Sequence, residues 1–151
     1  MGIALFDSNI LIDALRGVDQ AMIELHYFKH IAISSITWME LIAKPLAEEA
    51  AGRITAAEML AARTFIATFS VIHTNDAIMF EAAAVRADSM RHPPKIHLPD
   101  AIIQATANVT GRLLVTRNRK DFRGNNLRFP YDLHDGKIAN IAAPPVNQAT
   151  N

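Results

Sequence analysis

The sequence predicts an α/β domain of three layers, in which helices cover both faces of a central, mainly parallel sheet of four or five strands. Two observations support this fold class. Short apolar runs alternate along the chain with longer amphipathic segments, as strands alternate with helices in such folds. The clearest runs, at 3–6, 31–33 and 113–115, are uniformly apolar, as in strands buried on both faces of a parallel sheet. Right-handed crossovers would then place the strand-to-helix junctions at one edge of the sheet.

The order of the elements follows from apolar periodicity and from residues that begin or end helices. Strands are expected at 3–6, 31–33, 71–72, 113–115 and, weakly, around Phe129. Helices are expected at about 9–15, 19–28, 36–51, 55–69, 75–90 and 99–110. Ser8 or Asn9 can cap the first helix, Thr55 and Glu58 match a capping box, and Pro45 should kink or divide the third helix.

Length and composition limit the class of protein. A chain of 151 residues should form one domain, expected at 1–135, followed by a loosely ordered tail at 136–151. The formal net charge is zero, so binding to nucleic acid would have to use a local patch. Cysteine is absent, which excludes disulfides and thiolate metal sites. No apolar run reaches membrane-spanning length, so we expect a cytoplasmic protein without a membrane partner.

Acidic residues stand close to the predicted strand-to-helix junctions. Asp7 directly follows the first strand, Glu40 lies about one turn into the helix after the second strand, and Asp121 follows the strand at 113–115. Asp100 lies in the first turn of a helix that Pro99 opens, where the helix dipole stabilises a carboxylate. If that helix also begins at the same edge, four carboxylates converge there. Their mutual repulsion would favour a bound divalent cation.

The donor set indicates which cation and which chemistry to expect. Oxygen ligands alone suit Mg²⁺ or Mn²⁺, whereas zinc would want histidine or cysteine at metal spacing. A magnesium ion with vacant positions can activate water and stabilise charge on a phosphoryl group. The expected reaction is therefore phosphodiester hydrolysis without a covalent enzyme intermediate.

Four sequence blocks together resemble a PIN domain, specifically the VapC-type toxin ribonucleases of bacterial toxin–antitoxin pairs. The blocks occur in the family's order at 6–13, 35–41, 99–107 and 114–122. The resemblance implies a three-layer PIN-like domain with Mg²⁺- or Mn²⁺-dependent endoribonuclease activity. It also implies a homodimer that acts as the toxin of a type II pair and is neutralised by a cognate antitoxin. DNA would then be reached only indirectly, through the antitoxin.

The resemblance also carries residue roles over to this chain. Asp7, Glu40 and Asp100 match the three most regular acidic ligands of the family. The fourth position is shared between Asn118, which takes the family's usual place, and Asp121, which supplies the remaining carboxylate. Supporting roles fall to Ser8, Thr116 and Asn118, because small polar residues orient ligands or water in such sites.

Basic residues near the fourth acidic position are candidates for RNA contacts. Arg117, Arg119 and Lys120 could hold phosphates beside a metal site, although such a run is often only a solvated surface. Asp13 should face away from Asp7 by helical geometry and is ranked below the other acids.

Two other functions remain open from the sequence. One is a phosphatase or phosphotransferase with Asp7 as nucleophile and with Thr116 and Lys120 on the phosphate. Such enzymes commonly carry a second Asp two residues on, where this chain has Asn9. The other is a PIN-like binding module without catalysis.

Overall fold

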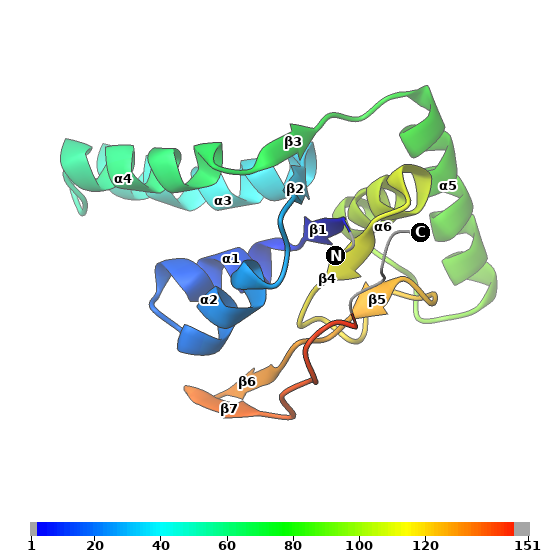
Figure 1. Ribbon diagram of the computed structural model, residues 1–151. Helices are drawn as coiled ribbons and strands as arrows, with labels where there is room; N and C mark the ends of the chain where they lie inside the picture. The colour runs from blue at the N-terminus through cyan, green and yellow to red at the C-terminus, as the bar shows by residue number, and fades with distance from the viewer. Residues whose placement is uncertain (1–2, 147–151) are drawn as a thin grey trace.

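A computed structural model describes residues 3–146 and shows a five-stranded, entirely parallel sheet (Figure 1). The strand order is β3-β2-β1-β4-β5. The strands are β1 (Ala4–Phe6), β2 (Ile31–Ser34), β3 (Ser70–Ile72), β4 (Leu113–Val115) and β5 (Leu127–Arg128). The predicted α/β fold class is therefore confirmed. The weakest expected strand, near Phe129, ends one residue earlier than that residue.

Six helices occur in the described part of the chain, close to the predicted ranges. They are α1 (Ser8–Leu15), α2 (Asp19–His26), α3 (Ser35–Ala50), α4 (Ala56–Ala67), α5 (Asp76–Arg91) and α6 (Leu98–Thr110). The predicted capping box at Thr55 and Glu58 is present in full. Pro45 lies inside α3 without dividing it. Among residues 3–146, no helix has both the length and the apolar character needed to cross a membrane.

The first helix begins differently from the prediction. Its N-cap is Asp7, not Ser8 or Asn9. Asp7 has an extended backbone, and its carboxylate Oδ1 accepts a hydrogen bond from the backbone N–H of Ser8 at 2.8 Å. Aspartate caps helices as well as serine or asparagine does, so the capping preference could not distinguish the three neighbours.

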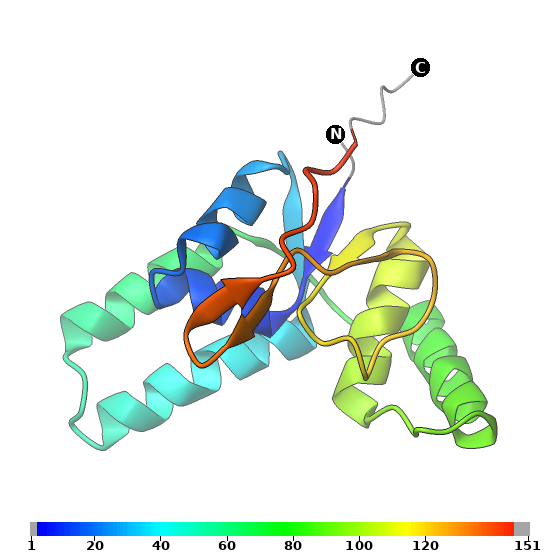
Figure 2. The ribbon, with the colours of Figure 1, turned by 90° about the horizontal axis from the view of Figure 1, so that it is seen from below.

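Helices lie on both faces of the sheet (Figure 2). An apolar layer of side chains packs between the sheet and the helices on each face. On one face, Phe6, Ile33 and Val115 pack with the apolar sides of α1 to α4. On the other face, Leu5 and Leu114 pack with α6, and α5 covers α6 from outside. Successive residues of β1 thus serve opposite layers, which explains why the run at 3–6 is apolar throughout.

A hairpin crosses the boundary expected at 135. Strands β6 (Asp132–His134) and β7 (Lys137–Ala139) pair in antiparallel fashion. The two turn residues, Asp135 and Gly136, have φ of 49° and 75°, as a type I′ hairpin turn requires. Regular structure therefore continues into the segment predicted as a loose tail. The division of the chain into domain and tail stays a prediction, and its last residues, 147–151, lie outside the described part.

Candidate metal and active site

The candidate site begins where the strand order reverses. From β1 the chain builds outward through β2 to β3, and then returns to add β4 on the other side of β1. Phe6 and Val115 are paired in register, so Asp7 and Thr116 leave the sheet side by side. The backbone N–H of Asp7 donates to the carbonyl of Val115 at 3.0 Å. Open α/β sheets characteristically place ligand sites at this reversal, beyond the carboxyl ends of the strands.

The carboxylate of Asp7 is buried and firmly oriented. Its Oδ2 accepts hydrogen bonds from the hydroxyl of Thr116 at 2.7 Å and from the side-chain amide of Asn9 at 3.0 Å. Burial raises the pKa of Asp7 above its ordinary value, and the hydrogen bonds from Thr116 and Ser8 oppose that rise. The charge is thus costly to bury and has hydrogen bonds, but no lysine or arginine in residues 3–146 forms an ion pair with it.

Glu40 reaches the same region from α3. That helix begins at Ser34, whose hydroxyl accepts from the N–H of Thr37 at 3.0 Å. The side chain of Glu40 is half-buried. Burial raises the pKa of Glu40, the negative charge of Asp7 adds to the rise, and the hydroxyl of Ser8 opposes it. Ser8 therefore lowers the pKa of both carboxyls, and its supporting role stays a prediction.

Asp100 is the carboxyl group most strongly affected by the others. It lies in the first turn of α6, where Pro99 occupies the second helical position. Burial together with the negative charges of Asp121, Asp7 and Glu40, in that order, raises the pKa of Asp100 to about 6, although His97 works against the rise. The other three predicted acidic residues therefore lie close enough to Asp100 for their charges to raise its pKa.

The loop after β4 joins the two candidates for the fourth position. The side-chain amide of Asn118 donates to Oδ2 of Asp121 at 2.6 Å, and the backbone N–H of Asn118 donates to Thr116 Oγ1 at 3.0 Å. The side-chain oxygen of Asn118 also accepts from the N–H of Lys120 at 3.2 Å. Asn118 orients Asp121 from the same loop, so both take part in this corner of the site.

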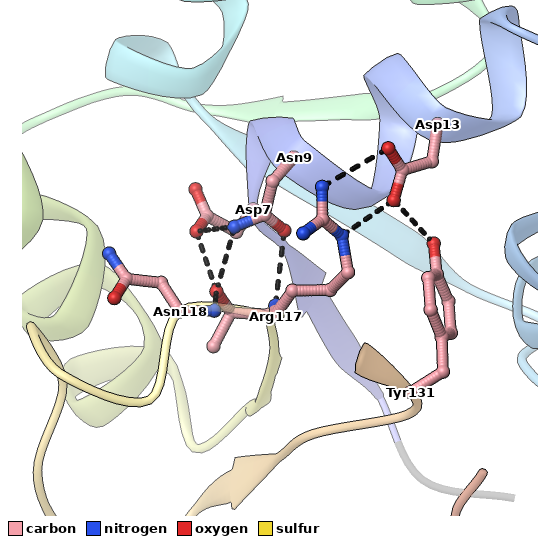
Figure 3. Close-up of polar contacts among 7 residues, drawn as sticks. Asp7, Asn9, Asp13, Arg117, Asn118 and Tyr131 are labelled. Carbon is pink, nitrogen blue, oxygen red and sulfur yellow. Dashed lines mark hydrogen bonds and ion pairs between the residues drawn. The ribbon is translucent and has the colours of Figure 1, made fainter. Parts of the chain in front are cut away.

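Asn9 is a site residue that the sequence prediction missed. Besides Asp7, its side-chain amide bonds Thr116 Oγ1 at 3.2 Å, and its carbonyl oxygen accepts from the backbone N–H of Arg117 at 3.2 Å (Figure 3). Asn9 thus ties α1 to the loop after β4. A polar side chain two residues after Asp7, in the first turn of a helix, was the available signal for this role.

The basic residues predicted to contact RNA differ in their surroundings. Arg117 forms a two-point ion pair with Asp13, which does lie apart from Asp7 as expected (Figure 3). Arg119 pairs with Asp132 at 3.1 Å and lies 4.6 Å above the ring of Phe129, at the surface. Lys120 is exposed. Arg119 and Lys120 are the members of this set whose charges face solvent.

The donor chemistry of the site fits a hard divalent cation. Four carboxylates supply oxygen ligands only, as Mg²⁺ and Mn²⁺ prefer, and Asp100 in particular carries a charge that its neighbours disfavour. In the side-chain positions seen here, no three acidic or histidine side chains of residues 3–146 already surround a point where an ion could sit. Asp121 is directed toward Asn118 instead.

The protein is thus an α/β domain with a parallel sheet, and its candidate acidic site lies where the strand order reverses between β1 and β4. The sequence matches the PIN domain over residues 4–124, and the chain belongs to the PIN domain family. A chain in a toxin–antitoxin complex from Klebsiella pneumoniae is 35% identical with a TM-score of 0.71, and the alignment covers 86% of this chain and 99% of that one. The predicted family is therefore confirmed.

Solved VapBC structures share the fold at lower identity. VapBC2 from Rickettsia felis, bound to a promoter DNA fragment, is 24% identical with a TM-score of 0.67, over 83% of this chain and 95% of that one. DNA-bound VapBC from Salmonella typhimurium is 23% identical with a TM-score of 0.69, over 85% and 96%. At these identities the two neighbours show a shared fold. No significant match was found among curated proteins.

Proposed function

We propose that this chain is a Mg²⁺- or Mn²⁺-dependent endoribonuclease and the toxin of a type II toxin–antitoxin pair. The observation that carries the proposal is the set of four acidic residues near the sheet reversal, where burial and, after it, the charges of the other three raise the pKa of Asp100 to about 6. Membership in the PIN domain family and 35% identity to a chain of a toxin–antitoxin complex support the same activity.

The acidic residues have distinct parts in this proposal. Asp7, Glu40, Asp100 and Asp121 would hold the ion, which when bound would activate a water molecule and offset charge on the phosphoryl group. Thr116 and Asn9 keep Asp7 oriented by donating to its Oδ2. Ser8 acts on Asp7 and Glu40, and Asn118 orients Asp121. The amides and hydroxyls thereby reduce the reorganisation that ligand binding requires.

The partners follow from the same assignment. A cognate antitoxin would bind the chain and neutralise it, and the chain would form a homodimer. Contact with DNA would be indirect, through the antitoxin, because a formal net charge of zero gives the whole domain no general attraction to nucleic acid. RNA would be held locally, with Arg119 and Lys120 as the exposed candidates for phosphate contacts.

An RNA cleavage assay with and without Mn²⁺ or Mg²⁺ tests the activity. Asp7→Asn and Asp100→Asn should each reduce the cleavage rate at least about a thousandfold, which corresponds to about 4 kcal/mol in the barrier. Asn at position 7 still caps α1, so the fold should survive the change. Asp76→Asn is the matched control, because Asp76 is an exposed aspartate that begins α5.

Three outcomes would contradict the proposal in different ways. Metal-dependent cleavage that persists in both site variants would reject the assigned residues. A phosphoryl adduct trapped on Asp7 would favour the phosphatase alternative. Failure to bind Mg²⁺ or Mn²⁺ in calorimetry would favour a binding module without catalysis.

A further inference from the structure

A buried ion pair lies directly beside the candidate site and is not accounted for by the roles assigned so far. Asp13, on α1, is 1% exposed and accepts from Arg117 Nε at 2.6 Å and Nη2 at 3.2 Å. The hydroxyl of Tyr131 donates to the same Oδ2 of Asp13 at 2.8 Å, and Tyr131 is fully buried. Figure 3 shows the three side chains converging from α1, the loop after β4 and the segment before β6.

Arg117 is fixed to α1 at its backbone as well as at its side chain. Its N–H donates to Oδ1 of Asn9 at 3.2 Å, while its guanidinium binds Asp13. Asn9 and Asp13 are four residues apart and therefore lie on one side of the helix. Asp7, the first acidic residue of the site, is the N-cap of the same helix. The contacts of Arg117 therefore hold the loop after β4 in a fixed position relative to Asp7.

The neighbours of Arg117 in sequence are both site residues. Thr116 Oγ1 donates to Asp7 and accepts from the N–H of Asn118, and Asn118 in turn orients Asp121. A shift of Arg117 would therefore move Thr116 and Asn118 together relative to Asp7. Arg117 therefore adds a side-chain attachment to the contacts that Asn9 and Thr116 already make between Asp7 and this loop.

We infer that Arg117 is a positioning residue, which acts through Asp13 and Tyr131 to hold the loop after β4 in register with Asp7. This inference rests on the proposed metal-dependent activity. A phosphate contact is the competing role, but it needs guanidinium N–H groups that are free. Arg117 directs two of them at Asp13, and its side chain is only 24% exposed.

The test compares Mn²⁺ dependence and RNA binding in Arg117→Met, which keeps a long side chain but loses the ion pair. The Mn²⁺ concentration for half-maximal cleavage should rise, and kcat should fall, by about 10- to 100-fold in total, as for other groups that support metal ligands. The affinity for a labelled single-stranded RNA, measured in EDTA, should keep its salt dependence. Arg117→Lys, which restores a charge but not the two-point geometry, should recover part of the loss.

Three alternative roles predict different results for Arg117→Met. A phosphate contact predicts a flatter dependence of RNA affinity on salt. A purely electrostatic role predicts tighter Mn²⁺ binding, because the positive charge of Arg117 lies near Asp7. A purely structural role predicts lower stability with an unchanged Mn²⁺ requirement. Each of these results would overturn the inference.

Arg128→Met is the matched control for loss of a buried ion pair. Arg128 pairs with Glu24, which is fully buried on α2, and it also donates to the carbonyl of Ala143. Its removal should lower stability without changing the Mn²⁺ requirement. If Arg117→Met does not fold, Tyr131→Phe provides the test, since it keeps the ring and removes one hydrogen bond to Asp13. It should raise the Mn²⁺ requirement in the same direction but less.

A second readout separates failure of the inference from failure of the proposed function. Mn²⁺ binding is also measured as an increase in the thermal unfolding midpoint, which needs no RNA. If the wild type does not cleave RNA but Arg117→Met still requires more Mn²⁺ for the same stabilisation, the function is wrong and the positioning role stands. If the wild type cleaves and the variant matches it in both assays, the positioning role is wrong.

Discussion

Two groups of carboxylates in this molecule are balanced in opposite ways. Asp13 and Glu24 are almost completely buried, and each pairs with an arginine 104 residues further along the chain. Asp7 is 5% exposed, and Glu40 and Asp100 are half-buried, yet none of these three forms an ion pair with a lysine or arginine of residues 3–146. Arginine side chains thus neutralise Asp13 and Glu24, whereas Asp7, Glu40 and Asp100 have no such partner among residues 3–146.

The difference separates carboxylates that hold the chain together from carboxylates that, in the proposed function, bind a metal ion. A buried charge with a well-placed partner fixes two segments, and removing one partner leaves the other charge isolated. A cluster of like charges without partners lowers the stability of the fold, so such a cluster is expected where function requires it. Burial raises the pKa of Asp7, Glu40 and Asp100, and neighbouring negative charges add to the rise for Glu40 and Asp100. A bound cation would offset these charges.

The largest effect on stability should come from the paired group. Asp13→Asn and Glu24→Gln should each lower the free energy of unfolding by about 3–5 kcal/mol, because each leaves a partly buried arginine without its charged partner. Urea unfolding in EDTA measures this loss. Glu49→Gln, at an exposed position on α3, is the control and should change little. A loss below about 1 kcal/mol in both variants would remove the distinction between the two groups.

The unpaired group should instead respond to metal. Mn²⁺ at a hundred times its dissociation constant should stabilise the wild type by about 2.7 kcal/mol, since it binds the folded form alone. Asp7→Asn should lose most of this gain, whereas Asp76→Asn, at an exposed site on α5, should keep it. Thermal unfolding with and without Mn²⁺ measures this stabilisation. An equal increase in the unfolding midpoint for the wild type and both variants would show that the ion binds elsewhere.

The sequence predicted the elements and the acidic residues because both depend on local signals. Uniformly apolar runs revealed the buried strands, and Asp7 and Asp100 stand directly where a strand ends or a helix begins. Glu40 was predicted from its place about one turn into the helix after the second strand, and the PIN-like order of the sequence blocks supported it; the structure has this residue half-buried on α3. Their ligand roles remain predictions, although the structure brings the side chains into one region.

The attachments between distant segments could not be read from the sequence. Arg117 stood in a basic run that suggested RNA contacts, and only the folded chain shows that Asp13 and Tyr131 surround it. The pairing depends on how α1 meets a loop more than a hundred residues later, which no local pattern specifies. By contrast, the hairpin turn at Asp135–Gly136 carried a known signal, since Asp-Gly favours type I′ turns, and it was overlooked.

A smaller effect, opposite in sign to that of the paired group, is expected for Asp100. Its pKa is about 6 in the folded protein against an ordinary value of 3.8, so the folded form binds more protons between these pH values. Its contribution to stability is therefore complete below about pH 4 and is lost as the pH rises through 6. Asp100→Asn should be more stable than the wild type by about 1 kcal/mol at pH 8, after allowance for solvent screening at a half-buried site.

The pH dependence of that gain is the decisive measurement. Urea unfolding in EDTA should show the advantage of Asp100→Asn at pH 8 and almost none at pH 3.5, where the wild-type carboxyl is mostly protonated in both states. Asp76→Asn controls for loss of a negative charge at a helix N-terminus and should show no gain at pH 8. A destabilised Asp100→Asn at pH 8 would mean that its carboxylate is compensated like that of Asp13.

The smallest effect should distinguish the exposed basic residues from Arg117. Arg119→Met and Lys120→Met should each reduce the slope of log affinity for single-stranded RNA against log salt by about 0.7, the value for one phosphate contact. Arg119 keeps a surface ion pair with Asp132, which salt also weakens, so its charge remains available to RNA. Arg117→Met should leave the slope unchanged, because its charge is already balanced by Asp13. A reduced slope for Arg117→Met, with unchanged slopes for Arg119→Met and Lys120→Met, would show that Arg117 contacts an RNA phosphate. Its ion pair with Asp13 would then exist only in the free protein.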